Sequence, residues 1–483
     1  MGKPARYGWV AAVAAALTVL AAVIALALVR PDGPDHVMVA PSSTAPPEPE
    51  PVPVLPAAGT GVPAPTAEGV RAVIDQLVRG GELGPAVSVA VVDALTGQQL
   101  YGHQPDRPTI PASTTKLVTA ATALASLGPA HQLATVAVAG TDPGEVVLVG
   151  GGDPTLAVGD AGFYPDPARL DRLAGQVGAA LGDAEVSRVT VDASLFTGPV
   201  HGPWDPDIPG SGFVGPVTAL MTDGARTDPD PAQEQRPARR FGAPDLAAGE
   251  AFAELLGVPA GSVARGAAPE PATPARAGRS AAGPAGGFPA PGTELGRVTS
   301  PPLQRLVEFM LRTSDNMVAE ALARQVALAR GEPASFAGAA AAMAKVLAEL
   351  GSPLGPGELA DGSGLSRSNR LTATLLTDLL ATAASGPERP HAGLFPALPV
   401  AGWSGTLADR YRSPQPRTTP GAGAVRAKTG SLAGVDALAG VVTTADGRVL
   451  GFALLADAVP VEQSTARAVL DRIAAALAGC GCR

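Results

Sequence analysis

The segment Pro111-Ala112-Ser113-Thr114-Thr115-Lys116 decides how this sequence is interpreted, because it places a lysine three residues after a serine. Positions i and i+3 share one face of a helix, so we expect the Lys116 amine within reach of the Ser113 hydroxyl. A serine is a weak nucleophile without an adjacent base, and a lysine desolvated near other cations is neutral enough to serve as that base. A serine cap followed by a surface lysine has the same spacing. The motif therefore gains its meaning from motifs farther along the chain.

A second motif, Ser314-Asp315-Asn316, lies between two predicted helices. All three residue types favour helix boundaries, so a capping role is the simplest interpretation. In the catalytic interpretation, the Ser314 hydroxyl relays a proton and the Asn316 amide holds a substrate amide. The motif is weak when it is considered alone.

A third motif, Lys428-Thr429-Gly430-Ser431, comes just before a predicted hairpin. It is either a polar strand end or a strand edge that pairs with an extended substrate. In the second case Lys428 and Thr429 meet a carboxylate, and Gly430 leaves room for close approach. The chain has only four lysines, and two of the three that lie outside the N-terminal tail belong to these motifs.

The order of the three motifs is that of class A β-lactamases and penicillin-binding proteins. From Glu68 to the C-terminus, the sequence resembles the penicillin-binding protein 4 type of D-alanyl-D-alanine carboxypeptidase/endopeptidase, the class C low-molecular-mass penicillin-binding proteins. The resemblance does not extend to the Pro- and Ala-rich loops around Pro229–Arg240 and Ala267–Pro291. Three further segments carry it: Gly151-Gly152-Asp153-Pro154, Asp361-Gly362-Ser363-Gly364-Leu365-Ser366 and Gly402-Trp403-Ser404-Gly405-Thr406-Leu407.

The resemblance implies an α+β fold of the serine β-lactamase/DD-peptidase type, in which helices flank an antiparallel sheet. It also implies a large inserted domain between the first two motifs, which are 201 residues apart. Composition agrees with this, because the middle of the chain changes to short strands and Pro-, Ala- and Gly-rich loops. We expect residues 67–134 and 296–483 to form the transpeptidase-like domain and residues 135–295 to form the inserted domain.

For function, the resemblance implies a serine DD-peptidase that acts on peptidoglycan stem peptides ending in D-Ala-D-Ala through an acyl-enzyme and that binds β-lactam antibiotics. Ser113 would be the nucleophile and Lys116 its base, and the backbone N–H groups of Ser113 and Ser431 would form the oxyanion hole. Ser314, close to Lys116, would pass a proton to the leaving D-alanine. No cofactor or metal is needed. The substrate would be bound by Asn316, Lys428, Thr429, Gly430 and Ser431.

Two other functions compete with this one: a serine β-lactamase on the same fold, and a non-catalytic β-lactam sensor or wall-binding protein. The long insertion and the absence of an evident deacylating glutamate favour the peptidase over the β-lactamase. A pure binder has no need of the Ser314 relay. A net charge of −9 argues against a nucleic-acid partner, and two cysteines exclude a disulfide scaffold. The five histidines lack the spacing of metal ligands.

The N-terminal segment predicts where the protein lies relative to the cell membrane. Residues 8–29 form a run of 22 residues without a charge, long enough for a membrane-spanning helix, and Lys3 and Arg6 before it favour a cytoplasmic N-terminus. We expect residues 1–30 to be an uncleaved signal-anchor, with a cleaved signal peptide as the alternative. Residues 31–66 contain eleven prolines and predict an extended linker. The catalytic body would then lie outside the cytoplasm, anchored to the cell membrane or secreted.

Periodicity of apolar residues predicts the elements of the body. Asp446-Gly447 is expected to turn a hairpin. The segment Asp361–Ser366 is expected to form a tight loop near the cleft, and Trp403 to be packed. Cys480 and Cys482 could form a disulfide, stay free or pair with another chain. Helices are expected over 67–79, 113–127, 303–311, 317–329, 336–350 and 465–478, and strands over 86–92, 98–101, 135–138, 146–149, 186–191, 435–444 and 448–456.

Overall fold

A five-stranded antiparallel sheet carries the third motif at its edge, with strand order β2-β1-β10-β9-β8. The computed structural model describes residues 62–270, 287–386, 389–412 and 417–482. The expected hairpin around Asp446-Gly447 is confirmed, because it joins the two neighbouring strands β9 and β10. The strands are β1 (Val87–Asp93), β2 (Gln99–His103), β8 (Val425–Leu432), β9 (Val435–Thr443) and β10 (Val449–Ala456).

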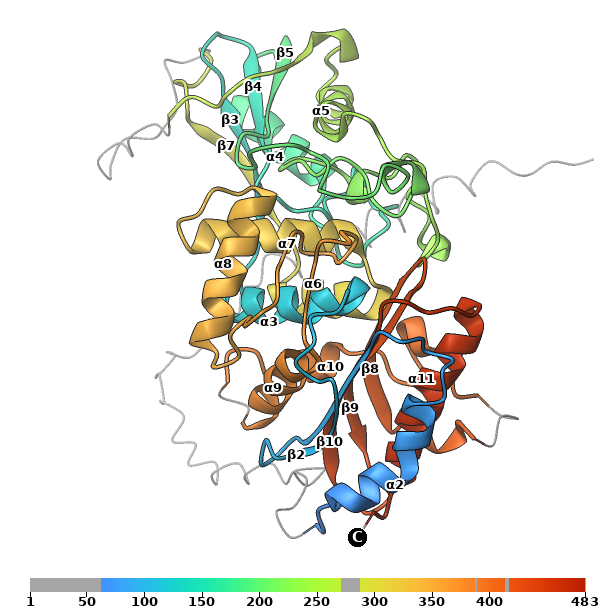
Figure 1. Cartoon of the computed structure of the whole chain (residues 1–483). Helices are drawn as coiled ribbons and strands as arrows, with labels where there is room; N and C mark the ends of the chain where they lie inside the picture. Colours follow the sequence, from blue (N-terminus) through green and yellow to red (C-terminus); the bar gives the residue numbers. More distant parts are fainter. Residues whose placement is uncertain (1–61, 271–286, 387–388, 413–416, 483) are drawn as a thin grey trace, which may run out of the picture. The chain divides into compact units, whose positions relative to one another are not determined.

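Both faces of this sheet are buried, and the size of the side chains differs between them. Large residues such as Val89 of β1 and Phe452 of β10 face the helices α2 (Ala67–Val78) and α11 (Gln463–Ala478). Alanines such as Ala90 and Ala453 face the opposite side, where a helical layer packs closely. Successive side chains of each strand point to opposite faces, so this one sheet separates two hydrophobic cores. Figure 1 shows α2 and α11 side by side.

The helical layer positions the first and second motifs. Its central helix is α3 (Thr115–Leu127), which is buried on nearly all sides over its first ten residues. The three helices predicted between residues 303 and 350 are confirmed within one or two residues, whereas α9 and α10 were not predicted. The other helices of the layer are α6 (Leu303–Thr313), α7 (Asn316–Ala329), α8 (Phe336–Glu349), α9 (Ala373–Ala384) and α10 (Leu394–Ala397).

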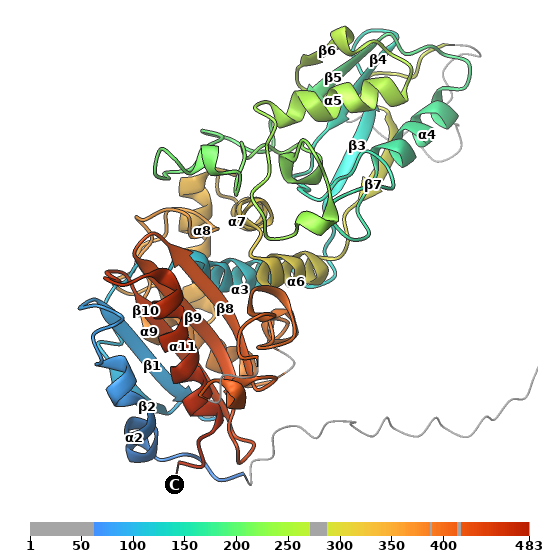
Figure 2. The same cartoon turned by 90° about the vertical axis from the view of Figure 1, so that its right-hand side faces the viewer.

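The chain between the first two motifs builds a second five-stranded sheet, of order β6-β5-β4-β3-β7. The pairs β4–β5 and β5–β6 are parallel, and α4 (Leu170–Leu181) and α5 (Pro244–Leu255) are their crossovers and share the core of this sheet (Figure 2). Both helices were missed from sequence. The limits of the inserted domain stay a prediction. The strands are β3 (Ala134–Ala139), β4 (Glu145–Val149), β5 (Arg188–Asp192), β6 (Val263–Arg265) and β7 (Glu294–Thr299).

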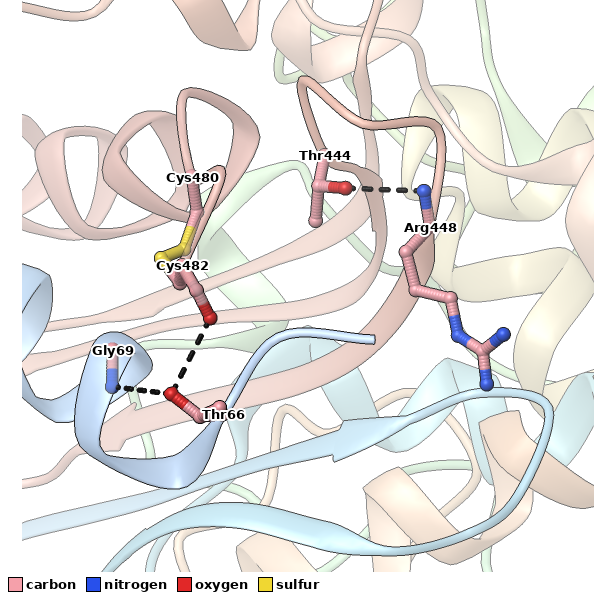
Figure 3. Close-up of a disulfide and its surroundings, with 6 residues drawn as sticks. All are labelled: Thr66, Gly69, Thr444, Arg448, Cys480 and Cys482. Carbon is pink, nitrogen blue, oxygen red and sulfur yellow. Dashed lines mark hydrogen bonds between the residues drawn. A yellow bond between two sulfur atoms is a disulfide. The ribbon is translucent and has the colours of Figure 1, made fainter. Parts of the chain in front are cut away.

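The end of the described chain packs against its beginning. Cys480 and Cys482 are joined in a disulfide, a pairing that the sequence left open (Figure 3). The backbone N–H of Thr66 donates to the carbonyl of Cys482 at 2.7 Å. The Thr66 hydroxyl caps α2 by accepting from the N–H of Gly69 at 3.1 Å, as Figure 3 shows. These contacts fix where the first helix of the body starts.

The predicted membrane segment at residues 8–29 and most of the predicted linker lie outside the described residues. Within residues 62–482, as far as they are described, no helix is long and apolar enough to cross a membrane.

A buried ion pair joins the ends of two central strands and provides a test of the sheet. Asp93 accepts from Arg448 at 2.6 and 2.9 Å, and both side chains are buried. Arg448→Met leaves an uncompensated carboxylate in the core, which typically costs about 3–5 kcal/mol. We expect urea unfolding to report a loss of that size. Arg297→Met, which breaks an exposed pair with Glu294, should cost less than about 1 kcal/mol. Equal effects of the two substitutions would contradict this assignment.

Candidate active site

Ser113 lies in a 3-10 turn, η1 (Ala112–Thr114), directly before α3, and not within the α-helix that the sequence predicts from residue 113. The turn starts from Ala112, whose φ is +46°, a conformation that is strained for a residue with a side chain. Lys116 on the first turn of α3 donates from Nζ to the Ser113 hydroxyl at 3.0 Å. The expected juxtaposition of hydroxyl and amine is therefore present.

The Lys116 amine is buried and has two further acceptors. Nζ donates to Asn316 Oδ1 and to the carbonyl of Ser363, both at 2.7 Å. Burial lowers the pKa of Lys116 to about 8, although the carboxylates of Asp361, Glu320 and Asp315 act in the opposite direction. The amine is thus neutral in a useful fraction of molecules near pH 8, and it can accept a proton from Ser113.

The loop Asp361–Ser366 lies against the Lys116 amine and is tight, as expected. The Asp361 carboxylate accepts from the N–H groups of Gly364 and Ser366, both at 2.7 Å, and so closes the loop. Gly364 has φ +82°, and a Cβ there would lie 1.9 Å from the carbonyl oxygen of Ala112. A glycine is required for this loop to approach the nucleophile turn.

Glu320 of α7 holds the same loop from the other side. Its carboxylate accepts from the N–H of Ser363 at 3.0 Å and of Gly362 at 3.3 Å. Burial, followed by the charge of Asp361, raises the pKa of Glu320 to about 7. Sequence analysis missed Glu320. Its position four residues after Asn316, on the same helix face, was the available signal.

Ser314 lies at the junction of α6 and α7 with φ +65°. Its hydroxyl accepts from Lys428 at 2.9 Å. This contact adds a partner that the sequence interpretation, which placed Ser314 close to Lys116, did not include. The Lys428 amine also donates to the carbonyl of Thr429 at 2.8 Å and is buried. Burial, followed by the positive charges of Lys116 and Arg410, lowers the pKa of Lys428 well below its ordinary value.

Asp315 ties the second motif to the inserted chain. It caps α7 by accepting from the N–H of Val318 at 3.0 Å, and it accepts from the Tyr164 hydroxyl at 3.1 Å. The Arg226 guanidinium lies 3.5 Å from the same carboxylate. Burial alone would raise the pKa of Asp315, but the guanidinium groups of Arg226 and Arg240 hold it below its ordinary value. These contacts fix Asp315, and Asp315 thereby holds its neighbours Ser314 and Asn316 in position.

The third motif lies on β8, the edge strand of the first sheet. A Cβ on Gly430 would lie 2.7 Å from the carbonyl oxygen of Pro111. That the glycine makes room for a substrate stays a prediction, and the structure adds that it makes room for the turn that carries Ser113. Thr429 donates to the Thr406 hydroxyl at 2.9 Å, and Ser431 donates to Asp436 at 3.0 Å.

The three motifs open on one cleft of about 600 Å³. Ser113, Ser314 and Asn316 line it together with β8, and the inserted chain supplies another part of its wall. Side chains of the inserted chain that line the cleft, none of them predicted, are Phe163, Ile208, Ser211, Phe213, Arg226, Gln235, Arg236 and Arg240.

One expectation about this region is wrong. Trp403 was expected to be packed, yet its side chain is 82% exposed. The glycine two residues later explains the shape of the loop, because a Cβ on Gly405 would lie 2.3 Å from the carbonyl oxygen of Arg312. The loop is therefore held by its glycine backbone and not by the indole.

The motif geometry agrees with comparisons to known proteins. The family model of the D-Ala-D-Ala carboxypeptidase 3 (S13) family matches residues 70–256 and 285–478. The chain belongs to this family. It is a serine-type DD-peptidase, a hydrolase. This outcome confirms the functional class that the three motifs predicted and favours it over the two alternatives.

Relatives of this S13 peptidase cover nearly its whole length. The carboxypeptidase DacB of Mycolicibacterium smegmatis is 38% identical over 99% of both chains. A carboxypeptidase of Mycobacterium tuberculosis is 37% identical over 92% of this chain and 90% of its own. The crystal structure of penicillin-binding protein 4 from Haemophilus influenzae is 22% identical, covers 85% of this chain and 97% of that chain, and superposes with a TM-score of 0.63. The expected α+β fold is thereby confirmed.

The Glu320 carboxylate, whose charge acts on Lys116, leads to a prediction for the pH dependence of acylation. Glu320→Gln keeps an acceptor for the Ser363 N–H but removes a negative charge that favours the Lys116 ammonium. Since the base must be neutral, the rate of acylation should rise with pH, and its midpoint should move down by about 1 pH unit in the variant. Stopped-flow acylation by one β-lactam between pH 5 and 10 measures this.

Asp153→Asn is the matched control for that measurement. Asp153 is also a buried carboxylate, with a pKa that burial raises to about 6, but it is not among the charges that act on Lys116. Its removal should leave the midpoint unchanged. An unchanged midpoint in Glu320→Gln would show that this carboxylate does not act on the base.

Proposed function

We propose that this S13 peptidase hydrolyses peptides ending in D-Ala-D-Ala through an acyl-enzyme on Ser113. The observation that carries this mechanism is the 3.0 Å contact between the Ser113 hydroxyl and the buried amine of Lys116, whose other two acceptors are uncharged oxygens. Neutral Lys116 takes the proton as Ser113 attacks the carbonyl of the penultimate D-alanine. The Asn316 amide nitrogen, which already donates to the Phe213 carbonyl at 3.0 Å, has a second hydrogen for the acyl-side amide of the substrate.

The edge strand β8 supplies the rest of the machinery. The first residues of β8 already bond to the chain around Val400, since the N–H of Ala427 donates to the carbonyl of Pro399 at 3.0 Å. An extended peptide would lie farther along this edge, near Ser431, where the N–H groups of Ser431 and Ser113 stabilise the oxyanion. The Ser314 hydroxyl, held by Lys428 at 2.9 Å, passes a proton to the leaving amine. Thr429 and the charge of Lys428 receive the terminal carboxylate. Water then releases the acyl group and restores Ser113.

The substrates that we propose are the stem peptides of peptidoglycan, and β-lactams are their covalent mimics. The support is chemical, since a β-lactam presents a carbonyl and a carboxylate to the same nucleophile and the same cationic strand edge. If the leaving amine belongs to a second stem peptide, the same steps cleave a cross-link, which would make the protein an endopeptidase as well.

Loss of one hydroxyl tests this mechanism. Ser113→Ala should abolish covalent labelling by a fluorescent penicillin and the release of D-alanine from a muropeptide mixture, because no acyl-enzyme can form. Mass spectrometry of the products distinguishes trimmed stems from cleaved cross-links. Ser126→Ala removes a hydroxyl at the other end of α3, where it accepts from Arg330, and should keep both activities. Labelling that persists in Ser113→Ala would place the nucleophile elsewhere.

We further propose that residues 8–29 anchor the protein in the cell membrane with the body outside. The support is the uncharged run of 22 residues behind Lys3 and Arg6 and the Pro-rich segment after it. A linker of this composition is semi-rigid and extended, which lets a body act at a distance from the bilayer.

Accessibility to protease tests the topology. Protease added to intact cells without their wall should cut within residues 31–66 and release a soluble body that still binds penicillin. A control with lysed cells shows that the protease reaches all of the protein. A body that is protected in intact cells and cleaved only after lysis would contradict the proposed orientation, and a body that is found free in the medium beforehand would indicate a cleaved signal peptide.

A further inference from the structure

A buried arginine lies one turn along α7 from Glu320, on the side away from the cleft. Arg324 is 1% exposed, and its Nη1 donates to the backbone carbonyl of Glu320 at 3.2 Å and lies 3.5 Å from the Glu320 carboxylate. Positions i and i+4 share one face of a helix, so α7 itself brings the two charges together. Because the desolvation of a buried ion pair offsets much of its attraction, stability alone does not account for this pair.

Aromatic rings hold the other side of the Arg324 guanidinium. Its central carbon lies 4.1 Å from the ring centroid of Phe336, at the start of α8, and 5.5 Å from that of Phe196, in the inserted chain. Ring faces attract a cation without neutralising it. Among the described residues, Glu320 is the one carboxylate within 4.0 Å of this guanidinium. Burial lowers the pKa of Arg324, but an arginine stays protonated in the working pH range of proteins.

Glu320 connects this arginine to the proposed base. The Glu320 carboxylate accepts from the N–H of Ser363 at 3.0 Å, and the carbonyl of Ser363 accepts from Lys116 Nζ at 2.7 Å. The charged groups that face Glu320 are Arg324 on its own helix, Asp361 in the loop and Lys116 on α3. The carboxylates that act on the Lys116 amine are those of Asp361, Glu320 and Asp315. Arg324 therefore reaches the base by way of Glu320.

The route through Glu320 fixes the sign of the effect. Burial and the charge of Asp361 raise the pKa of Glu320 to about 7, and the charge of Arg324 acts in the opposite direction. Without Arg324, Glu320 would keep its proton into the range in which Lys116, with a pKa of about 8, titrates. A neutral Glu320 no longer favours the ammonium, so the pKa of Lys116 would fall. A direct effect of the lost positive charge on the amine would raise it instead.

We propose that Arg324 is a positioning residue of the acylation step, which keeps the Glu320 carboxylate charged behind the Lys116 amine. The proposal rests on the proposed function, since it takes Lys116 as the base. Arg324 is not among the residues that line the cleft. It sets the charge around the base and takes no part in bond breaking.

The test removes the charge of Arg324 in two backgrounds. Arg324→Gln supplies a neutral donor, and the midpoint of the pH dependence of acylation by one β-lactam should move down by about 1 pH unit, as in Glu320→Gln. The double variant Arg324→Gln/Glu320→Gln should have the midpoint of Glu320→Gln alone, because the carboxylate through which Arg324 acts is gone. Arg324→Lys keeps the charge and should keep the midpoint near that of the parent chain.

Arg330→Gln is the matched control, because Arg330 ends the same helix and pairs with Glu349 at 2.8 Å. Its midpoint should equal that of the parent chain. If Arg324→Gln does not fold, Arg324→Met fills the space beneath the two rings without a charge and has the same expected shift. A midpoint that stays unchanged or moves up in the folded variant overturns the proposal, and so does a further shift in the double variant.

Infrared difference spectra provide a readout that needs no acylation. At about pH 8, the carbonyl band of protonated carboxyl groups should be stronger in Arg324→Gln than in the parent chain, and the double variant should lack this gain. A band that does not grow overturns the proposal. Failure of the proposed function is detected separately: a parent chain that no β-lactam acylates and that releases no D-alanine contradicts the mechanism, whereas the infrared comparison still decides whether Arg324 keeps Glu320 charged.

Discussion

Two ammonium groups, those of Lys116 and Lys428, are buried within one site, and the rest of the site depends on how they are accommodated. Each has lost its hydration and each repels the other, which favours the neutral amine. Among the described residues, no carboxylate lies within 4.0 Å of either Nζ. Their contacts are hydroxyl, amide and carbonyl oxygens, while Glu320 and Asp361 stand one layer behind. A direct ion pair would fix the proton on the amine, whereas neutral acceptors orient the amine and let the proton leave.

The oxygens that accept from the two lysine amines come from segments far apart in sequence. The fold must therefore bring the backbones of these segments into contact at one point. A turn before a helix carries Ser113, a helix junction carries Ser314, and an edge strand carries Lys428. Two glycines make this convergence possible. Gly364 and Gly430 each lie where a Cβ would meet the carbonyl oxygen of Ala112 or Pro111. Alanines on the inner face of the sheet have the same effect on a larger scale, because small side chains let the helical layer approach closely.

The sequence was informative where chemistry is local and less so where contacts are set by tertiary packing. Spacing alone placed Ser113 beside Lys116, and periodicity located β1, β2, β9 and β10, although not β8, which carries the third motif. Partners across the fold were not available from spacing. Nothing in the sequence shows that Lys428 would reach Ser314, or that Gly430 would face the nucleophile turn. The exposed Trp403 shows the same limit, since residue type predicts average burial and the Gly405 backbone decides this loop.

The carboxylate partners of the cleft arginines connect the inserted chain to the catalytic lysines. A guanidinium with its own carboxylate, such as Arg410 with Asp471, contributes little net charge to the cleft and serves the fold. Arg226 lies 3.5 Å from the Asp315 carboxylate, and the charge of Arg240 also lowers the pKa of that carboxyl group. Asp315 in turn favours the charged form of Lys116. The residues proposed to move protons lie in the three motifs, and Asp315 is therefore a route by which arginines of the inserted chain act on the proposed base.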